Sequence, residues 1–299
     1  MYQIKRWYLM LAGKSVWHVN QDIGKCFAKD EIRGYYNNMM EKVTKMPELL
    51  DNTELPKLNL EKGKFTYFPV AIFQYALGCY DLYLQTKEES YIRKFIQCVE
   101  WTLAHQDDGG RWNNFSHYCP KTPYGAMAQG EGASVLVRAY VYTKEQKYLD
   151  AAKKAIDFML LPLNEGGTTK YEGEDAFLME YTFKNVVMNG FIFSWWGLYD
   201  YVVATHDEGK YKQALDNTMK SLVKILPKFK CDYWSMYSLD RLIASPFYHN
   251  LHIAQMQAMY QLTGEQIFDD YAKRWTRQQK NPFCKGLAFL RKSIQKILE

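Results

Sequence analysis

A repeated segment is the feature that most constrains how this chain can fold. Four apolar, aromatic-rich stretches each end at a Thr, and five or six residues later an aromatic residue opens an amphipathic stretch. The four threonines are Thr86, Thr143, Thr205 and Thr263, which are separated by 57, 62 and 58 residues. Periods this long are typical of stacked supersecondary units, none of which can bury its own hydrophobic face.

Each unit is predicted to be a helical hairpin. The first helix is apolar nearly all round, as in residues 70–84 and 186–203, which indicates a helix enclosed by others. The second helix is amphipathic, as in residues 211–225, where apolar side chains recur at helical spacing. Inner apolar helices alternating with outer amphipathic ones predict an all-α fold, an (α/α) toroid or barrel of helical hairpins with little or no separate β domain.

We expect two regions along the chain. Residues 1–60 should form a helical N-terminal region packed on the toroid, with the clearest helix at residues 30–46 and a polar connector at residues 55–63. Residues 61–299 should form the toroid and a basic C-terminal helix. With 47% hydrophobic residues the chain is not a disordered polypeptide.

The net charge and the cysteines exclude several classes of protein. There are 38 Lys and Arg against 33 Asp and Glu, and a net charge of +5 falls well short of that of a nucleic-acid-binding protein. Six cysteines with no CxxC pair indicate scattered reduced thiols and neither a disulfide framework nor a zinc site. We therefore expect no nucleic-acid partner and no metal.

The ends of the chain bear on location. The apolar run at residues 7–12 is too short for a secretory leader or a membrane span, so we expect a cytoplasmic protein without a membrane span. The basic run at residues 273–296 is predicted to be the solvated face of an amphipathic helix docked on the toroid. Attraction of this run to an anionic polysaccharide, or peripheral contact with a membrane surface, stays open.

The polar residues of the repeat gather before the inner helices. Four segments rich in aromatics, amides and small residues stand there, namely KFTYFP, TPYGAMAQGEG, MEYTFKNVVMNG and YSLDRLIASPFYHNLH. They share one phase of the repeat, so they should converge on one mouth of the toroid. A mouth lined in this way predicts a site for a ligand.

Several of these stretches together resemble the C-terminal domain of D-glucuronyl C5-epimerases, enzymes that convert D-glucuronate to L-iduronate within heparosan-type chains. The matching stretches are AMAQGEGASVLVRAY at 126–140, EYTFKNVVMNGFIFSWWGLYDY at 180–201, MYSL at 236–239, YHNLHIAQMQ at 248–257 and KRW at 273–275. The resemblance extends over roughly residues 65–280. The animal members carry additional N-terminal β-rich domains that have no counterpart in this sequence, so we expect a catalytic toroid standing nearly alone. Because the animal members form dimers, a homodimer stays open.

Inversion at C5 of a uronate imposes its own chemical demands. A weakly acidic proton alpha to a carboxylate leaves one face of the sugar, and another proton arrives on the opposite face. Two acid/base groups are needed, together with donors that stabilise the enolate-like intermediate, and no redox cofactor is required. The resemblance implies that Glu180 is the base and Tyr248 the acid/base on the other face. It also implies that Tyr181 and Tyr237 orient or stabilise the intermediate.

The resemblance also implies a set of binding residues. Gln129, Asn189, His249 and Asn250 match stretches that contact the substrate in the family, although Gln129 and Glu131 could instead satisfy the amides of a helix N-terminus. A tyrosine shuttles protons poorly at neutral pH unless a cation stabilises its phenolate. The candidate cations are His249, Arg241 and Arg111, and Arg241 is also predicted to bind the substrate.

One substitution leaves the identity of the polymer open. Asp240 occupies the position where the animal pattern has an Arg. The predicted partner is therefore an anionic, uronate-containing polysaccharide, and the predicted function is that of an isomerase which inverts C5 of its uronate.

Two other functions stay open. A polysaccharide lyase would abstract the same proton and then expel the C4 substituent. A non-catalytic carbohydrate-binding homologue would keep the fold without the reaction.

Overall fold

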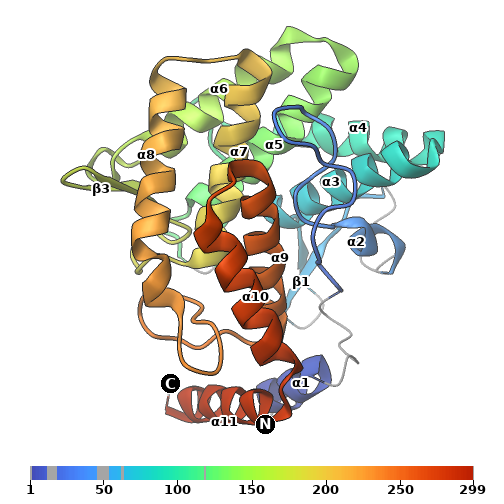
Figure 1. Ribbon diagram of the computed structural model, residues 1–299. Coiled ribbons are helices and arrows are strands. Elements are labelled where there is room, and N and C mark those ends of the chain that lie inside the picture. Colours follow the sequence, from blue (N-terminus) through green and yellow to red (C-terminus); the bar gives the residue numbers. More distant parts are fainter. Residues whose placement is uncertain (1, 12–18, 46–53, 62–63, 118, 299) are drawn as a thin grey trace.

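The computed structural model describes residues 2–11, 19–45, 54–61, 64–117 and 119–298. Four helical hairpins follow one another along this part of the chain, and their first helices pack side by side in the order α3, α5, α7 and α9 (Figure 1). The hairpins are α3 (Pro69–Thr86) with α4 (Glu89–Ala104), α5 (Ala126–Thr143) with α6 (Gln146–Leu160), α7 (Met188–Thr205) with α8 (Lys210–Ile225), and α9 (Pro246–Thr263) with α10 (Gln266–Lys280). The prediction of an all-α toroid of helical hairpins is confirmed.

The repeat sets the ends of the inner helices. All four have 18 residues, and each ends at one of the four repeated threonines. Each threonine hydroxyl donates a hydrogen bond of 2.7–2.9 Å to the carbonyl oxygen four residues earlier. The next residue adopts the left-handed backbone conformation in every case, which ends the helix and turns the chain back toward the outer helix. The sequence period is therefore a structural period.

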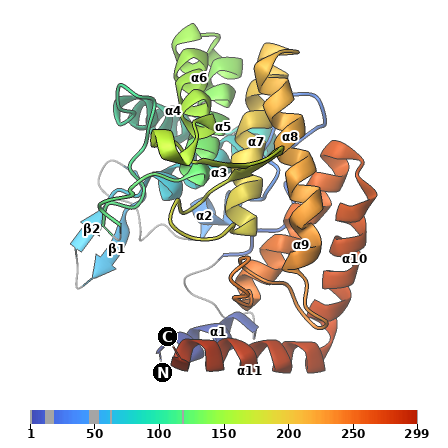
Figure 2. The same cartoon turned by 90° about the vertical axis from the view of Figure 1, so that its left-hand side faces the viewer.

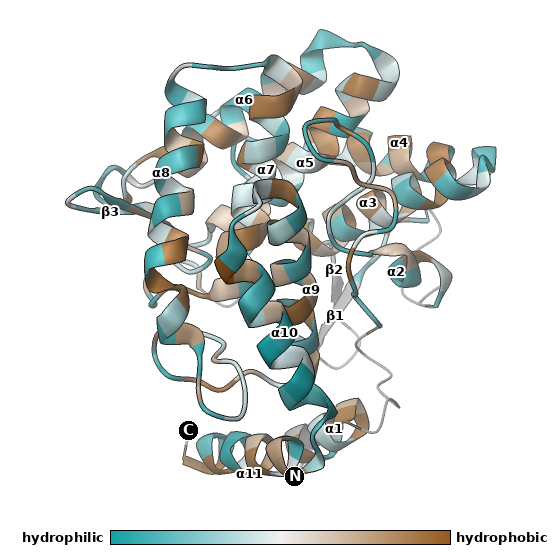
Figure 3. Cartoon of the chain, viewed as in Figure 1, coloured by the Kyte–Doolittle hydropathy of each residue, from teal (hydrophilic) through white to brown (hydrophobic). Residues whose placement is uncertain are grey.

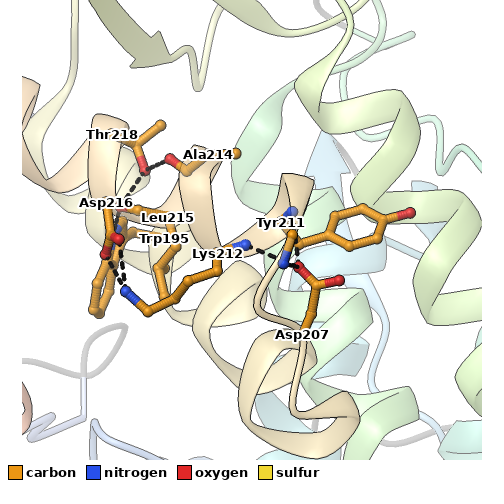
Figure 4. Close-up of polar contacts among 9 residues, drawn as sticks. Trp195, Asp207, Tyr211, Lys212, Ala214, Leu215, Asp216 and Thr218 are labelled. Atoms are coloured by element: carbon orange, nitrogen blue, oxygen red, sulfur yellow. Dashed lines mark hydrogen bonds and ion pairs between the residues drawn. The ribbon is translucent and has the colours of Figure 1, made fainter.

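The outer helices are anchored by local polar contacts, as α8 illustrates (Figure 4). Asp207 Oδ1 accepts hydrogen bonds from the backbone N–H groups of Tyr211 at 3.0 Å and Lys212 at 3.1 Å, so it caps the first turn. Trp195 of α7 donates its indole N–H to the Leu215 carbonyl at 3.1 Å, which joins the inner helix to the outer one.

Two of the inner helices touch through their backbones. A Cβ atom added at Gly197 of α7 would lie 2.2 Å from the carbonyl oxygen of Gly130 in α5. One added at Gly130 would lie 2.5 Å from the Cα of Ser194. The crossing of α5 and α7 therefore requires glycine at both positions.

The N-terminal region differs from the prediction. Helix α1 (Tyr2–Leu11) and the short helix α2 (Met40–Thr44) are present, but residues 30–39 are not helical, so the helix expected at 30–46 is wrong there. Backbone pairing replaces it, because Gly24 N–H donates to Tyr36 O at 2.9 Å and Gly34 N–H to Cys26 O at 3.1 Å. These contacts fold the segment back on itself and override its helical periodicity. Residues 46–53 lie outside the described residues.

Short β-hairpins lie in the connections between helices. Strand β1 (Leu58–Glu61) pairs antiparallel with β2 (Lys64–Thr66), and β3 (Thr169–Glu172) pairs antiparallel with β4 (Asp175–Leu178). The connector expected at residues 55–63 therefore contains a strand. Two short 3-10 turns, Leu163–Glu165 and Leu226–Phe229, complete the connections. Neither hairpin forms a separate β domain in the described part of the chain.

The basic C-terminal helix is present as α11 (Pro282–Leu298). Pro282 cannot continue α10, and the Asn281 side chain accepts a hydrogen bond from the Phe283 N–H at 2.9 Å, so the chain turns sharply between the two helices. Helix α11 lies beside α1 at one end of the molecule, as Figure 2 shows. No helix in the described residues is both long and apolar enough to cross a membrane.

A buried ion pair lies near the C-terminal ends of the inner helices. Arg138 of α5 and Asp200 of α7 have no exposed side-chain surface, and their Nη1 and Oδ2 atoms are 2.6 Å apart. The same guanidinium donates to the carbonyl oxygens of Arg33 and Gly34, both at 3.0 Å. Tyr36 donates its hydroxyl to the other oxygen of Asp200 at 2.5 Å. The N-terminal segment is thus tied to the inner ring.

The third member of this centre is Asp81 of α3. Asp81, Arg138 and Asp200 occupy the same position of their helices, the thirteenth of 18 residues. Asp81 Oδ1 accepts a hydrogen bond from the backbone N–H of Tyr35 at 2.9 Å, and burial raises the pKa of its carboxyl to about 7. The charge of Arg138 therefore acts on two acidic positions of the repeat. It forms an ion pair with Asp200, and it lowers the pKa of Asp81 against the effect of burial.

We predict that Arg138→Met lowers the free energy of unfolding by about 3–5 kcal/mol, because it leaves Asp200 buried without its cation. Adding Asp200→Asn should recover part of this loss, since no charge then remains buried. Arg111→Met, which breaks the partly exposed pair with Asp107, should change stability by less than about 1 kcal/mol. Urea unfolding curves measure all three, and equal losses for Arg138→Met and Arg111→Met would contradict this account.

Candidate active site

The four predicted catalytic side chains lie where the inner helices begin. Glu180 and Tyr181 follow β4 and precede α7, Tyr237 precedes α9, and Tyr248 stands in the first turn of α9. These are the segments that the repeat placed at one phase.

Two glycines make room for Glu180. The loop is held against α5 by a hydrogen bond of 2.8 Å from the Ala126 N–H to the Met179 carbonyl. A Cβ atom at Gly125 would lie 2.1 Å from the Glu180 carbonyl oxygen, and one at Gly190 would lie 2.3 Å from its Oε2 atom. The backbone of Glu180 therefore lies against the start of α5, and its carboxylate lies against the first turn of α7.

Backbone pairing places Tyr237 at the start of α7. The Met188 N–H donates to the Tyr237 carbonyl at 3.2 Å, and the Leu239 N–H donates to the Val186 carbonyl at 3.0 Å. The rings of Tyr237 and Tyr248 lie against each other, with centroids 4.8 Å apart.

The four side chains form one cluster. Tyr181 lies beside Glu180 and Tyr237, Tyr237 lies beside Tyr248, and each group affects the pKa of its neighbours. Phe115 stacks on the Tyr181 ring at a centroid distance of 4.7 Å and fixes its plane. The structure thus brings Glu180, Tyr181, Tyr237 and Tyr248 together, as the sequence predicts, although their catalytic roles stay predictions.

Burial changes the acid/base character of these groups. It raises the pKa of Glu180 to about 7, against the hydrogen bond from Tyr181 and the positive charge of Lys184, which lower it. Burial also raises the pKa of Tyr181 and of Tyr237 well above the ordinary value, and the neighbouring Glu180 carboxylate adds to the effect. Near neutral pH the carboxyl group can therefore ionise while these two phenols remain proton donors.

The cation beside this cluster is Lys184, which the sequence analysis missed. Its Nζ atom lies 4.6 Å from the centroid of the Tyr181 ring. The predicted cation Arg111 instead pairs with Asp107 at 2.8 Å. Lys184 could have been found from its place three residues after Tyr181 in the same loop.

Two predicted binding residues are buried and form hydrogen bonds within the protein. Gln129 has no exposed surface, and its side chain exchanges hydrogen bonds of 3.4 Å with the backbone of Trp112. His249 is also fully buried, where its ring nitrogens contact the Ser235 hydroxyl at 2.8 Å and the Trp275 carbonyl at 3.2 Å. Burial lowers the pKa of His249 to about 3, so the ring is neutral. Neither side chain has exposed atoms with which to contact a substrate, and both brace the loops around the site.

The other predicted binding residues differ in exposure. Asn189 is 3% exposed, and its Oδ1 atom is buried without a hydrogen-bond partner in the described part of the chain. Asn250 and Arg241 are exposed, and the Arg241 carbonyl accepts a hydrogen bond of 3.1 Å from Gln295 of α11. Substrate contact by these three residues stays a prediction.

A second buried carboxyl was not assigned to the site from the sequence. Glu131 of α5 has no exposed surface, accepts a hydrogen bond of 2.9 Å from the Gln74 side chain and leaves its Oε2 atom unpartnered among the described residues. Burial raises its pKa to about 8, the charge of Glu180 raises it further, and Lys42 opposes this. Glu131 therefore contacts an amide side chain of α3 in place of the helix N-terminal amides considered above. Its signal in the sequence is a lone carboxyl between Gly130 and Gly132.

The described residues contain no group of three or more His, Cys, Asp or Glu side chains that could hold a metal ion.

We predict that Glu180→Gln stabilises the protein at alkaline pH. The folded-state pKa of about 7 lies above the ordinary value of 4.5, so Glu180 destabilises the fold as pH rises from 4.5 through 7. The variant should match the wild type at acidic pH and exceed it by up to about 3 kcal/mol above neutrality. Urea unfolding at several pH values measures the difference, with the exposed Glu208→Gln as a control that should show no such gain.

Comparisons with known proteins identify the family of the chain. The family model described as D-glucuronyl C5-epimerase C-terminus matches residues 106–277. A D-glucuronyl C5-epimerase of Caenorhabditis elegans is 26% identical over 217 residues, which cover 63% of this chain and 35% of that protein. An uncharacterized protein of Methanocaldococcus jannaschii is 31% identical over 160 residues, covering 50% of this chain and 51% of its own. The chain thus spans a third to a half of the length of these curated relatives.

One of the matched solved structures shares this fold at low sequence identity. A UGL variant with dGlcA-Glc-Rha-Glc has a TM-score of 0.50 and 13% identity, covering 70% of this chain and 61% of that one. An inactive variant of the alpha-1,6-mannanase GH76A of Salegentibacter sp. HEL1_6 with alpha-1,6-mannotriose has a TM-score of 0.47 and 15% identity, covering 71% and 62%. The family match extends over more than half of the chain and includes Glu180, Tyr181, Tyr237 and Tyr248. The chain belongs to the family defined by the C-terminal domain of D-glucuronyl C5-epimerases.

Proposed function

We propose that this protein is a C5-epimerase that converts D-glucuronate to L-iduronate, or performs a similar hexuronate inversion, within an anionic polysaccharide. The observation that carries the proposal is the cluster of side chains that runs from Glu180 through Tyr181 and Tyr237 to Tyr248. It offers an ionisable carboxyl at one end and a phenol at the other, which are the two acid/base groups that inversion requires.

In the proposed reaction, the Glu180 carboxylate removes the proton from C5, and the electrons of the C5–H bond move toward the sugar carboxylate to form an enolate-like intermediate. The hydroxyls of Tyr181 and Tyr237, kept protonated by their raised pKa, donate hydrogen bonds to the developing charge. Tyr248 delivers a proton to C5 on the opposite face and becomes a phenolate. Glu180 then releases its proton to water and the Tyr248 phenolate takes one up from water, which restores both groups.

The two buried carboxyls are proposed to have different roles. Glu180 adjoins the tyrosines, whereas Glu131 is held by Gln74 and has the higher pKa, about 8 against about 7. We therefore assign the role of base to Glu180, which adjoins the tyrosines, and not to Glu131.

We predict that the enzyme incubated with a glucuronate-containing polymer in heavy water places deuterium at C5, as measured by NMR. Glu180→Gln and Tyr248→Phe should each reduce this incorporation by about 10²–10⁴-fold, because each removes an acid/base group. Two matched controls, Glu131→Gln and the exposed Tyr142→Phe, should stay within about tenfold of the wild type.

Several outcomes of that experiment would contradict the proposal. Incorporation near the wild-type level in Glu180→Gln would remove this residue from its role. New ultraviolet absorbance from an unsaturated uronate would identify a lyase. Binding of the polymers without incorporation from any of them would identify a carbohydrate-binding protein.

We further predict that kcat/KM rises with pH and levels off above a pKa near 7, because only the ionised Glu180 can accept the C5 proton. Lys184→Met should move this pKa upward, since the lysine charge lowers it in the wild type. Lys220→Met, an exposed change on α8, is the control. A pH profile that Lys184→Met leaves unchanged would argue against Glu180 as the titrating base.

A further inference from the structure

Helices α1 and α11 form a pair at one end of the molecule, which we call the terminal platform. They lie side by side in both Figure 1 and Figure 2, and α11 departs from the end of α10. Lys292 of α11 has its Nζ atom 5.8 Å from the centroid of the Trp7 ring in α1. The platform is therefore one packed unit.

One face of α11 is apolar and exposed. Phe283 is 73% exposed, Leu290 56%, Ile294 47% and Ile297 73%. Their spacing of seven, four and three residues places them along a single stripe of the helix. Leu298 at its end is 81% exposed, and the hydrophobic residues are visible along α11 in Figure 3.

This concentration is unusual for the molecule. Apart from Tyr8 of α1, the large exposed hydrophobic residues outside α11 are spread over separate elements, namely Tyr142, Leu161, Tyr171, Phe183 and Tyr260. A contiguous exposed apolar stripe marks a surface that another body covers.

The platform is also strongly basic. Helix α11 contains Lys285, Arg291, Lys292 and Lys296, helix α1 contains Lys5 and Arg6, and neither helix contains Asp or Glu. Six positive charges therefore stand on these two helices, more than the net +5 of the whole chain.

We propose that the terminal platform docks the protein on an anionic phospholipid membrane. Helical spacing puts Arg291 at the side of the apolar stripe and Lys285, Lys292 and Lys296 on the opposite, polar face of α11. A helix with an apolar face and a basic polar face fits the boundary between acyl chains and acidic headgroups. A second copy of the same platform would bring like charges together, and a polysaccharide would leave the apolar stripe uncovered. The membrane alone matches both the stripe and the charge.

Docking would also fix the site relative to the membrane. Gln295 of α11 accepts a hydrogen bond of 3.1 Å from the Ile243 N–H and donates one of 3.1 Å to the Arg241 carbonyl. The same loop carries Tyr237, whose N–H donates to the Leu242 carbonyl at 2.6 Å. A protein bound through α11 therefore presents the Tyr237 loop at a set height above the lipid surface.

Vesicle flotation of the full chain tests the proposal. The wild type should float with vesicles of phosphatidylcholine mixed with phosphatidylglycerol, bind pure phosphatidylcholine at least about tenfold more weakly, and dissociate as salt is raised. The triple change Leu290→Ser, Ile294→Ser and Ile297→Ser, and separately the pair Lys285→Glu and Lys296→Glu, should each weaken binding at least about tenfold.

Matched controls carry the same chemistry elsewhere on the surface. Tyr142→Ser with Tyr171→Ser, and Lys220→Glu with Lys228→Glu, should bind vesicles as the wild type does. Light scattering should give the triple variant the same mass as the wild type, and circular dichroism should show that it is folded. The proposal fails if the wild type does not float, if the control pairs lose as much binding as the α11 variants, or if the triple variant dissociates a dimer. It also fails if the α11 lysine variants lose binding to a uronate polymer but keep binding to vesicles.

Discussion

The buried guanidinium of Arg138 is the group on which the rest of the structure depends. An arginine without exposed surface is tolerated only when a counter-ion and acceptors surround it, and here Asp200 and the carbonyls of Arg33 and Gly34 do so. Those carbonyls belong to the N-terminal segment, so one side chain joins the inner ring to a part of the chain that precedes it by about a hundred residues. The C-terminal parts of α5 and α7 are thereby joined to each other and to the N-terminal segment.

The opposite ends of the same helices are polar but incompletely satisfied. Glu180 Oε2, Glu131 Oε2 and Asn189 Oδ1 are all buried without hydrogen-bond partners in the described part of the chain. Buried groups of this kind destabilise a fold, and they are found where a ligand supplies the missing partner. A buried charged centre thus lies at one end of the ring, and a set of buried carboxyl and amide groups lies at the other.

The sequence predicted the helical repeat more completely than it predicted the side-chain arrangement of the site. The threonine period located the ends of all four inner helices, because a helix that ends in a left-handed residue is a local property. The non-helical segment at residues 30–39 was not predicted, since its shape comes from backbone pairing within the N-terminal region and from the contact of Tyr35 with Asp81 of α3. The burial of Gln129 and His249 was also missed, because a motif match gives a residue type and not the direction of its side chain. Glu131 joins the site through proximity in space, which spacing alone does not report, whereas Lys184 stands three residues after Tyr181 in the same loop.

Burial acts on the two kinds of acid in the site in the same direction, with opposite consequences. Raising the pKa of Glu180 to about 7 brings it to the range where a carboxyl is both ionisable and a better base. Raising the pKa of Tyr181 and Tyr237 moves them away from that range and keeps them as donors. Burial in one low-dielectric site therefore leaves Glu180 able to act as a base while Tyr181 and Tyr237 stay proton donors. In the proposed reaction each turnover leaves a proton on Glu180 and a phenolate at Tyr248, so both groups must exchange protons with water before the next turnover, and solvent deuterium can then reach C5.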